Sequence, residues 1–167
     1  MNAACYWITG LSGSGKTTQS KKLTKYLLDN NKPVILLDGD ILRIIMDSKA
    51  YNYHDRLKLG YQYSKLCNTI VSQNINVVIA VIGLFHELHL WNRENIKSYI
   101  EIFLDTPIEE LIKRDPKKLY KKASDKKIQN LVGVDIEPEF PNSPDIHIKW
   151  KKGMDENKTF DELMLQL

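Results

Sequence analysis

The sequence has little cysteine and no long apolar run, and these two shortages exclude several classes of protein. Cys5 and Cys67 are too few for a disulfide framework and too far apart for a zinc site, so we expect both to be core thiols. No apolar segment approaches the ~20 residues of a membrane-spanning helix. The N-terminus lacks the basic and apolar regions of a secretory leader. These features predict a cytoplasmic protein with no membrane partner.

The composition is that of an ordinary globular protein, but its positive charge is unevenly spread. The chain has 167 residues, 43% hydrophobic and 27% charged, which suits one domain, residues 1–167. Eight of the fifteen residues from Lys113 to Lys127 are lysine or arginine, whereas the net charge is only +3. This segment could be a solvated helical face or a nucleic-acid patch. We favour a mobile basic lid, about residues 113–133, because no aromatic residue except Tyr120 interleaves the charges.

Residues 10–17, G-L-S-G-S-G-K-T, fit the phosphate-binding pattern G-x-x-x-x-G-K-[ST]. The apolar run at residues 3–9 predicts a buried strand before this loop, and residues 16–28 predict an amphipathic helix after it. In that setting the backbone N–H groups of the loop can surround an anion, and the helix N-terminus adds partial positive charge. We therefore expect a bound nucleoside triphosphate, with Lys16 at its terminal phosphates and the Thr17 hydroxyl on Mg²⁺. The predicted nucleotide contacts are Gly10, Ser12, Gly13, Ser14, Gly15, Lys16, Thr17 and Thr18.

Further strands are predicted wherever a short apolar run recurs. Residues 33–37, 77–82 and 100–104 are continuous apolar runs of the kind found in parallel strands, and a shorter strand is expected near residues 146–148. Helical segments separate these runs. Alternating strands and helices after a P-loop predict a three-layer α/β/α fold with a mostly parallel five-stranded sheet.

The predicted helices follow from periodicity and from capping residues. Residues 55–72 carry a single apolar stripe and predict a long amphipathic helix. Thr106 and Glu109 have the spacing of a capping box for a helix whose first turn holds Pro107, and the sequence Asp115-Pro116 should end it. Further helices are expected to start near residue 91 and near residue 159.

Two carboxylates and an arginine follow the second predicted strand, in D-G-D-I-L-R at residues 38–43. Because the carboxyl ends of parallel strands open into the ligand crevice, Asp38, Asp40 and Arg43 should lie beside the P-loop. A carboxylate there can take a proton from a hydroxyl or hold Mg²⁺, and the arginine can bind an anion. The alternative is a purely structural role, a polar turn in which an Asp caps a helix. A P-loop alone does not separate a GTPase, an ATPase motor and a small-molecule kinase. We expect a kinase with the P-loop kinase fold, because the sequence lacks an N-K-x-D guanine signature and a second domain for a motor to move.

Several segments resemble the adenylyl-sulfate (APS) kinase family and occur in the family's order. They are G-L-S-G-S-G-K-T-T (10–18), L-D-G-D-I-L-R (37–43), L-D-T-P (104–107), K-R-D-P-K-K-L-Y-K-K-A (113–123) and V-G-V-D-I-E-P-E (132–139). The resemblance implies phosphorylation of the ribose 3′-hydroxyl of a nucleotide with an activated anhydride, using ATP and Mg²⁺. It implies a small-molecule partner rather than a nucleic acid. Because the family is often dimeric, a homodimer is a further expectation.

The resemblance also assigns roles to residues. Lys16 and Thr17 bind ATP phosphates and Mg²⁺, Asp38 and Asp40 supply the base and metal contacts, and Arg114 meets the ATP base. Lys16, Asp38 and Asp40 are thus the expected catalytic residues, and Thr17 and Asp38 the metal ligands. The expected acceptor contacts are Asp40, Arg43, Tyr51, Arg56, Phe85, His86, Lys121 and Leu131.

The departures from the family pattern fall on the acceptor side. Leu131 stands where the family's F-T-G-I-D has a Phe that stacks on the acceptor adenine, although Tyr51 keeps a ring at the other stacking position. The family's E-N-I-R-R run is missing after Arg56. Histidines at 86 and 89 replace arginines, and histidines are mostly neutral at cytoplasmic pH. Relative to the family, we therefore expect the same donor, ATP, and a changed acceptor.

Three functions remain open on the sequence. Adenylyl sulfate is the acceptor that the family implies by default. A pyrimidine conjugate is a close alternative, because the chain is similar to the divergent branch that contains cytidine diphosphoramidate kinase, which acts in modification of bacterial capsules. A smaller base would also suit Leu131. The third alternative is a non-catalytic nucleotide-binding protein.

Overall fold

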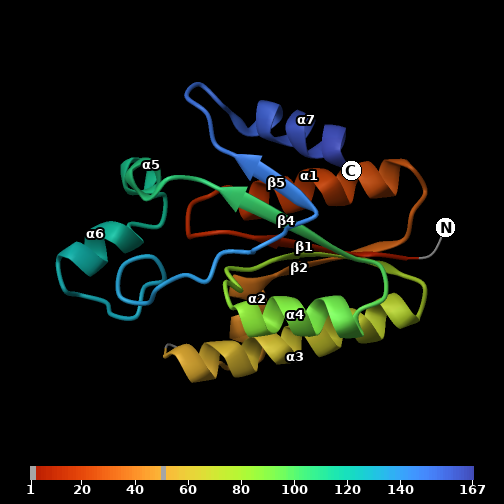
Figure 1. Cartoon of the computed structure of the whole chain (residues 1–167), viewed down its shortest axis with the longest axis horizontal. Helices are drawn as coiled ribbons and strands as arrows, with labels where there is room; N and C mark the ends of the chain where they lie inside the picture. The colour runs from red at the N-terminus through yellow and green to blue at the C-terminus, as the bar shows by residue number, and fades with distance from the viewer. Residues whose placement is uncertain (1–2, 50–51) are drawn as a thin grey trace.

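The computed structural model describes residues 3–49 and 52–167, and its centre is a five-stranded sheet (Figure 1). The strands are β1 (Cys5–Thr9), β2 (Val34–Asp38), β3 (Asn76–Ala80), β4 (Tyr99–Asp105) and β5 (Ile146–Lys149). Their order in the sheet is β2-β3-β1-β4-β5, and each pairs in parallel with its neighbours. The predicted α/β fold with a parallel five-stranded sheet is confirmed.

Helices cover both faces of this sheet and one of its ends (Figure 1). They are α1 (Lys16–Asp29), α2 (Gly39–Ile45), α3 (Tyr53–Ser72), α4 (His86–Asn95), α5 (Ile108–Arg114), α6 (Leu119–Ser124) and α7 (Glu156–Gln166). α1 and α7 lie on one face, and α3 and α4 on the other. The short helices α5 and α6 lie beyond the carboxyl ends of the strands. Among the described residues, no helix combines the length and the apolar character needed to cross a bilayer.

Alternate residues of β1 face the two helical layers, because successive side chains of a strand point to opposite faces. Cys5 and Trp7 are fully buried in one core cluster together with Cys67 of α3. Tyr6 and Ile8 belong to the cluster that includes residues of α1 and α7. Both cysteines are buried free thiols, as the sequence predicts.

Three segments differ from the sequence-based expectation near the site. β3 ends at Ala80, so Val81 and Ile82 continue past the strand into the loop before α4. α4 begins at His86, so the helix start predicted near residue 91 is wrong, and residues 91–95 form its last turns. α2 was not among the helices predicted from periodicity, and it agrees with the alternative in which an Asp caps a helix. It begins directly after Asp38, whose side chain accepts a hydrogen bond from Asp40 N, at 2.9 Å, and so caps the helix.

The helix starts at α5 and α7 also differ from the prediction. The capping box at Thr106 is wrong, because Pro107 occupies the N-cap of α5 and makes no side-chain cap bond. α5 does end at Arg114, as the following Asp-Pro sequence predicts. α7 starts earlier than predicted because Asp155 caps it, accepting hydrogen bonds from Asn157 N and Lys158 N.

Candidate active site

A cavity of about 630 Å³ opens at the carboxyl ends of the strands. Its walls come from the P-loop, the end of β2, the loop after β3, the start of α3 and the segment between α5 and α6. These segments are distant in sequence, and the parallel sheet brings them together. The predicted site residues that line it are Ser12, Gly13, Gly15, Lys16, Thr17, Thr18, Asp38, Asp40, Arg43, Arg56 and Phe85.

Other predicted site residues lie around the cavity without lining it. Gly10 packs so closely on β4 that a Cβ would lie 2.6 Å from Leu104 O, and the Ser14 side chain is buried. Arg114 pairs with Glu110 at 2.9 Å and lies over the Trp150 ring, 5.7 Å from its centroid. The remaining members of this group are His86, Lys121 and Leu131. Tyr51 lies outside the described residues.

The P-loop is shaped by glycines and by its own lysine. Gly13 and Gly15 have φ values of 83° and 96°, in the left-handed region that favours glycine, and Gly15 is the N-cap of α1. Lys16 Nζ donates a hydrogen bond to Leu11 O at 2.7 Å. Burial, reinforced by the nearby Lys117, lowers the pKa of Lys16 to about 8. The loop thus holds one cation beside the N-terminus of a helix, an arrangement that suits a phosphate chain.

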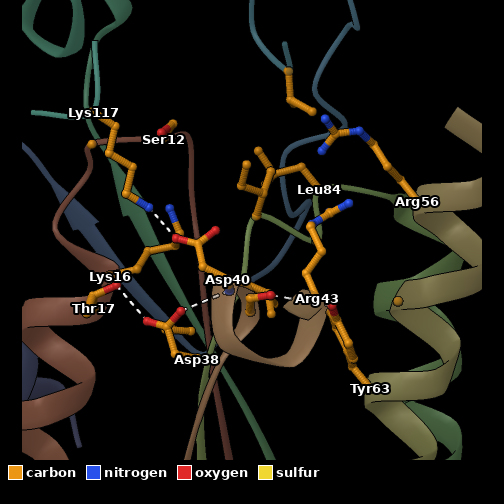
Figure 2. Close-up of a pocket in the computed structure, with 18 of the residues that line it drawn as sticks. Ser12, Lys16, Thr17, Asp38, Asp40, Arg43, Arg56, Tyr63, Leu84 and Lys117 are labelled. Atoms are coloured by element: carbon orange, nitrogen blue, oxygen red, sulfur yellow. Dashed lines mark hydrogen bonds and ion pairs between the residues drawn. The ribbon is translucent and has the colours of Figure 1, made fainter. Parts of the chain in front are cut away.

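Thr17 and Asp38 join the P-loop to the end of β2. Thr17 Oγ1 donates a hydrogen bond to Asp38 Oδ2 at 2.9 Å (Figure 2). Hydroxyl and carboxylate oxygens are the ligands that Mg²⁺ prefers, and this ion usually takes only one or two protein ligands beside phosphates and waters. Within residues 3–49 and 52–167, no group of three or more His, Cys, Asp or Glu could hold a metal ion. The Thr17–Asp38 pair therefore fits Mg²⁺ held together with a phosphate chain.

Asp40 faces the segment between α5 and α6. Its Oδ2 forms an ion pair with Lys117 Nζ, and both side chains are more than half exposed (Figure 2). Lys117 was not singled out from the sequence. The signal that could have found it is its place in the family-like segment 113–123. The pair places a cation of the basic segment 113–127 on a predicted catalytic carboxylate.

Arg43 and Arg56 lie on the side of the cavity away from Lys16, with Asp40 between (Figure 2). Arg43 comes from α2 and Arg56 from the first turn of α3. Arg56 Nη2 donates a hydrogen bond to Asn130 O at 2.9 Å, which ties α3 to the segment after α6. The cavity therefore carries positive charge at both ends and carboxylates in the middle.

The wall near the arginines is largely apolar. Leu131 is buried in a core cluster with Leu11 and Leu84, and its neighbour Val132 lines the cavity together with Ile136. The sequence predicted Leu131 as an acceptor contact, but it did not predict Val132 and Ile136. They could not be found from a motif, because any apolar residue can serve as wall.

The two histidines that replace family arginines bond to backbone. His86 Nε2 lies 2.8 Å from Phe140 O, and His89 Nε2 lies 2.7 Å from Gly83 O. Burial lowers the pKa of His89 despite the nearby Glu101. Both rings therefore tie α4 to a loop backbone.

The P-loop, the carboxylates behind it and the flanking arginines define a P-loop kinase. More specifically, the chain belongs to the adenylylsulphate kinase family, whose model matches residues 2–149. It is 40% identical over 142 residues to cytidine diphosphoramidate kinase of Campylobacter jejuni, covering 85% of this chain and 84% of the relative. It is 37% identical over 148 residues to adenylyl-sulfate kinase of Pseudomonas aeruginosa, covering 87% and 76%. The protein is therefore an ATP-using phosphotransferase of this family.

A solved structure agrees with this assignment. The Mycobacterium tuberculosis APS kinase CysC, in complex with AMPPNP and APS, superposes with a TM-score of 0.89 and 26% identity. The match covers 99% of this chain and 97% of that one. The P-loop kinase fold predicted from the sequence is thus that of the family.

Proposed function

We propose that this kinase transfers the γ-phosphoryl group of ATP to the ribose 3′-hydroxyl of an activated nucleotide conjugate. The observation that carries the proposal is the two-ended cavity, with Lys16 at one end, Arg43 and Arg56 at the other, and Asp40 between them. The P-loop end suits the triphosphate donor. The arginine end suits an acceptor that carries its own anionic groups, since arginine binds phosphate oxygens in a fixed fork geometry.

The residues have separate tasks in this reaction. Lys16 binds the terminal phosphates of ATP, and Thr17 and Asp38 hold Mg²⁺, which neutralises phosphate charge when bound. Asp40 takes the proton of the 3′-hydroxyl as the ribose oxygen bonds to the γ-phosphorus and the bond to the leaving ADP breaks. Asp40 is the better base of the two carboxylates because both oxygens of Asp38 accept hydrogen bonds, from Thr17 and from Asp40 N. By contrast, Asp40 pairs through Oδ2 with the exposed Lys117, which substrates can displace. Arg114 and Lys121 belong to the lid that closes over the donor.

We propose cytidine diphosphoramidate as the acceptor. Two observations support this choice, the 40% identity to a kinase of that name and the aliphatic cavity wall at Val132 and Ile136, next to the buried Leu131. A family member that stacks adenine uses a Phe where this chain has Leu131, so the cost of losing that stack falls mainly on an adenine acceptor. The second candidate is adenylyl sulfate, which is favoured by the structural match to an APS-bound kinase.

Product analysis tests the transfer itself. The purified enzyme is incubated with ATP, Mg²⁺ and either conjugate, and the products are separated and examined by mass spectrometry and phosphorus NMR. We expect ADP and a conjugate phosphorylated on its 3′-hydroxyl, and no product from the matched 3′-deoxy conjugate. Asp40→Asn serves as the enzyme control. Failure to phosphorylate either conjugate would contradict the proposal and favour a non-catalytic nucleotide-binding protein.

A further inference from the structure

Glu139, a half-buried carboxylate in the segment before β5, contacts three segments around the arginine end of the cavity. Its Oε1 accepts a hydrogen bond from Tyr53 OH at 2.8 Å, and its Oε2 accepts one from His86 N at 2.6 Å. Its own backbone N donates to Leu84 O at 3.2 Å. One residue therefore joins the start of α3, the end of the loop before α4 and the first residue of α4.

Both carboxylate oxygens of Glu139 are used by donors that lie in helix starts. Tyr53 is the first residue of α3, and His86 is the first residue of α4, whose N-cap Phe85 makes no side-chain cap bond. A carboxylate at a helix N-terminus is favoured by the helix dipole as well as by the hydrogen bond. Burial raises the pKa of Glu139, but the hydrogen bonds from His86 N and Tyr53 outweigh it and hold the pKa below its usual value. Glu139 is thus charged at neutral pH.

The residues that Glu139 tethers flank two side chains of the cavity wall. Leu84 and Phe85 both line the cavity, and they are only 1% and 5% exposed. The bonds to Leu84 O and His86 N fix the backbone on either side of Phe85. The Phe85 ring meets the Tyr53 ring edge-on, with centroids 5.0 Å apart and planes at 89°. Because Tyr53 is itself held by Glu139, both rings depend on the same carboxylate.

We propose that Glu139 is a positioning residue that holds the Leu84–Phe85 wall in place for the acceptor. The inference rests on the proposed function only in placing the acceptor at the arginine end. The hydrogen bonds of Glu139 go to Tyr53, Leu84 and His86, all outside the P-loop, so its effect should fall on the acceptor rather than on ATP.

The kinetic test uses Glu139→Gln, which keeps the size of the side chain but replaces one accepting oxygen by an NH₂ group. Glu137→Gln is the matched control, because Glu137 is exposed and lies on the same segment. We expect Glu139→Gln to raise the KM for the better of cytidine diphosphoramidate and adenylyl sulfate by about tenfold or more, with the KM for ATP and kcat changed less than about threefold. Glu137→Gln should behave as wild type. An equal rise in both KM values, or a loss confined to kcat, would overturn the proposal.

Amide hydrogen exchange at His86 provides a readout that needs no acceptor. We expect exchange at this amide to be faster in Glu139→Gln and unchanged in Glu137→Gln; unchanged exchange in both would overturn the proposal. Should Glu139→Gln fail to fold, Tyr53→Phe removes one donor and should raise the acceptor KM in the same selective way. If wild type phosphorylated neither conjugate, the proposed function would fail by itself, and the exchange result would still decide whether Glu139 holds the wall.

Discussion

Lys117 of the segment between α5 and α6 forms an ion pair with Asp40 at the end of β2. Both residues line the cavity, and the pair engages the carboxylate that is proposed to take the proton of the acceptor. Because both side chains are more than half exposed, the contact is one that water and substrates can compete with, and it should contribute little to global stability. We therefore expect the substrates to compete with Lys117 for Asp40.

We predict that Lys117→Met loosens the lid without unfolding the protein. Chymotrypsin cleaves beside aromatic residues such as Tyr120, so nicking of the segment 113–133 measures its mobility. Nicking should be faster in Lys117→Met than in Lys113→Met, a control in the same basic segment. In wild type, ATP together with the acceptor should suppress nicking. Equal rates with and without ligand would instead indicate a static basic face.

Lys16→Ala should abolish turnover and leave the fold intact. Lys16 neutralises charge on the transferring phosphoryl group, and its ammonium makes one hydrogen bond, to Leu11 O. The control is Lys21→Ala, an exposed lysine on the same helix. Steady-state kinetics measure the turnover, and circular dichroism checks that the fold is intact. Near-wild-type turnover in Lys16→Ala would refute the assignment of the P-loop.

The lowered pKa of Lys16 predicts a pH-dependent affinity for ATP. With a pKa of about 8, Lys16 is cationic at pH 7 and loses its charge as the pH rises through 8. The Kd for ATP of the acceptor-free enzyme should therefore rise between pH 7 and pH 9, by up to about tenfold for each pH unit above 8. Lys16→Arg should bind ATP with little dependence on pH in this range, because arginine keeps its charge. Calorimetric titrations at several pH values make the comparison. Equal pH dependence in the two proteins would assign the effect to another group.

Asp38→Asn and Asp40→Asn should both lower kcat, but for different reasons. Asp40→Asn removes the proposed base and should cost on the order of 10²-fold or more in kcat at any Mg²⁺ concentration. Asp38→Asn removes a charged metal ligand, so its defect should lessen as Mg²⁺ is raised. Measuring kcat across a Mg²⁺ series separates the two roles. Normal kcat in both variants would mean that the base lies elsewhere.

The sequence predicted the fold well because its signals were local and strong. The apolar runs correspond to all five strands, and the P-loop residues Lys16 and Thr17 lie where the motif requires. The start of α4 was missed because the carboxylate that bonds to His86 N belongs to Glu139, which is distant in sequence and gives no local capping signal. The capping box at Thr106 was wrong because α5 begins only after Pro107.

The acceptor side of the site was harder to predict than the donor side. The P-loop is continuous in sequence, whereas the wall proposed to face the acceptor is assembled from the loop before α4, from α3, and from Val132 and Ile136. The sequence indicated His86 as an acceptor contact, but the structure places its ring on Phe140 O. Aliphatic residues such as Val132 and Ile136 line the cavity without carrying any motif. Only the three-dimensional arrangement brings these residues together.

The central claim is a kinase of this family whose acceptor is a cytidine conjugate, and the kcat/KM values for two acceptors test it most directly. Cytidine diphosphoramidate and adenylyl sulfate are compared at saturating ATP and Mg²⁺. Loss of one base–aromatic stack costs about 1–3 kcal/mol, which corresponds to tenfold or more in discrimination. We predict that kcat/KM is at least about tenfold higher for cytidine diphosphoramidate. A higher kcat/KM for adenylyl sulfate would contradict this account and make adenylyl sulfate the acceptor.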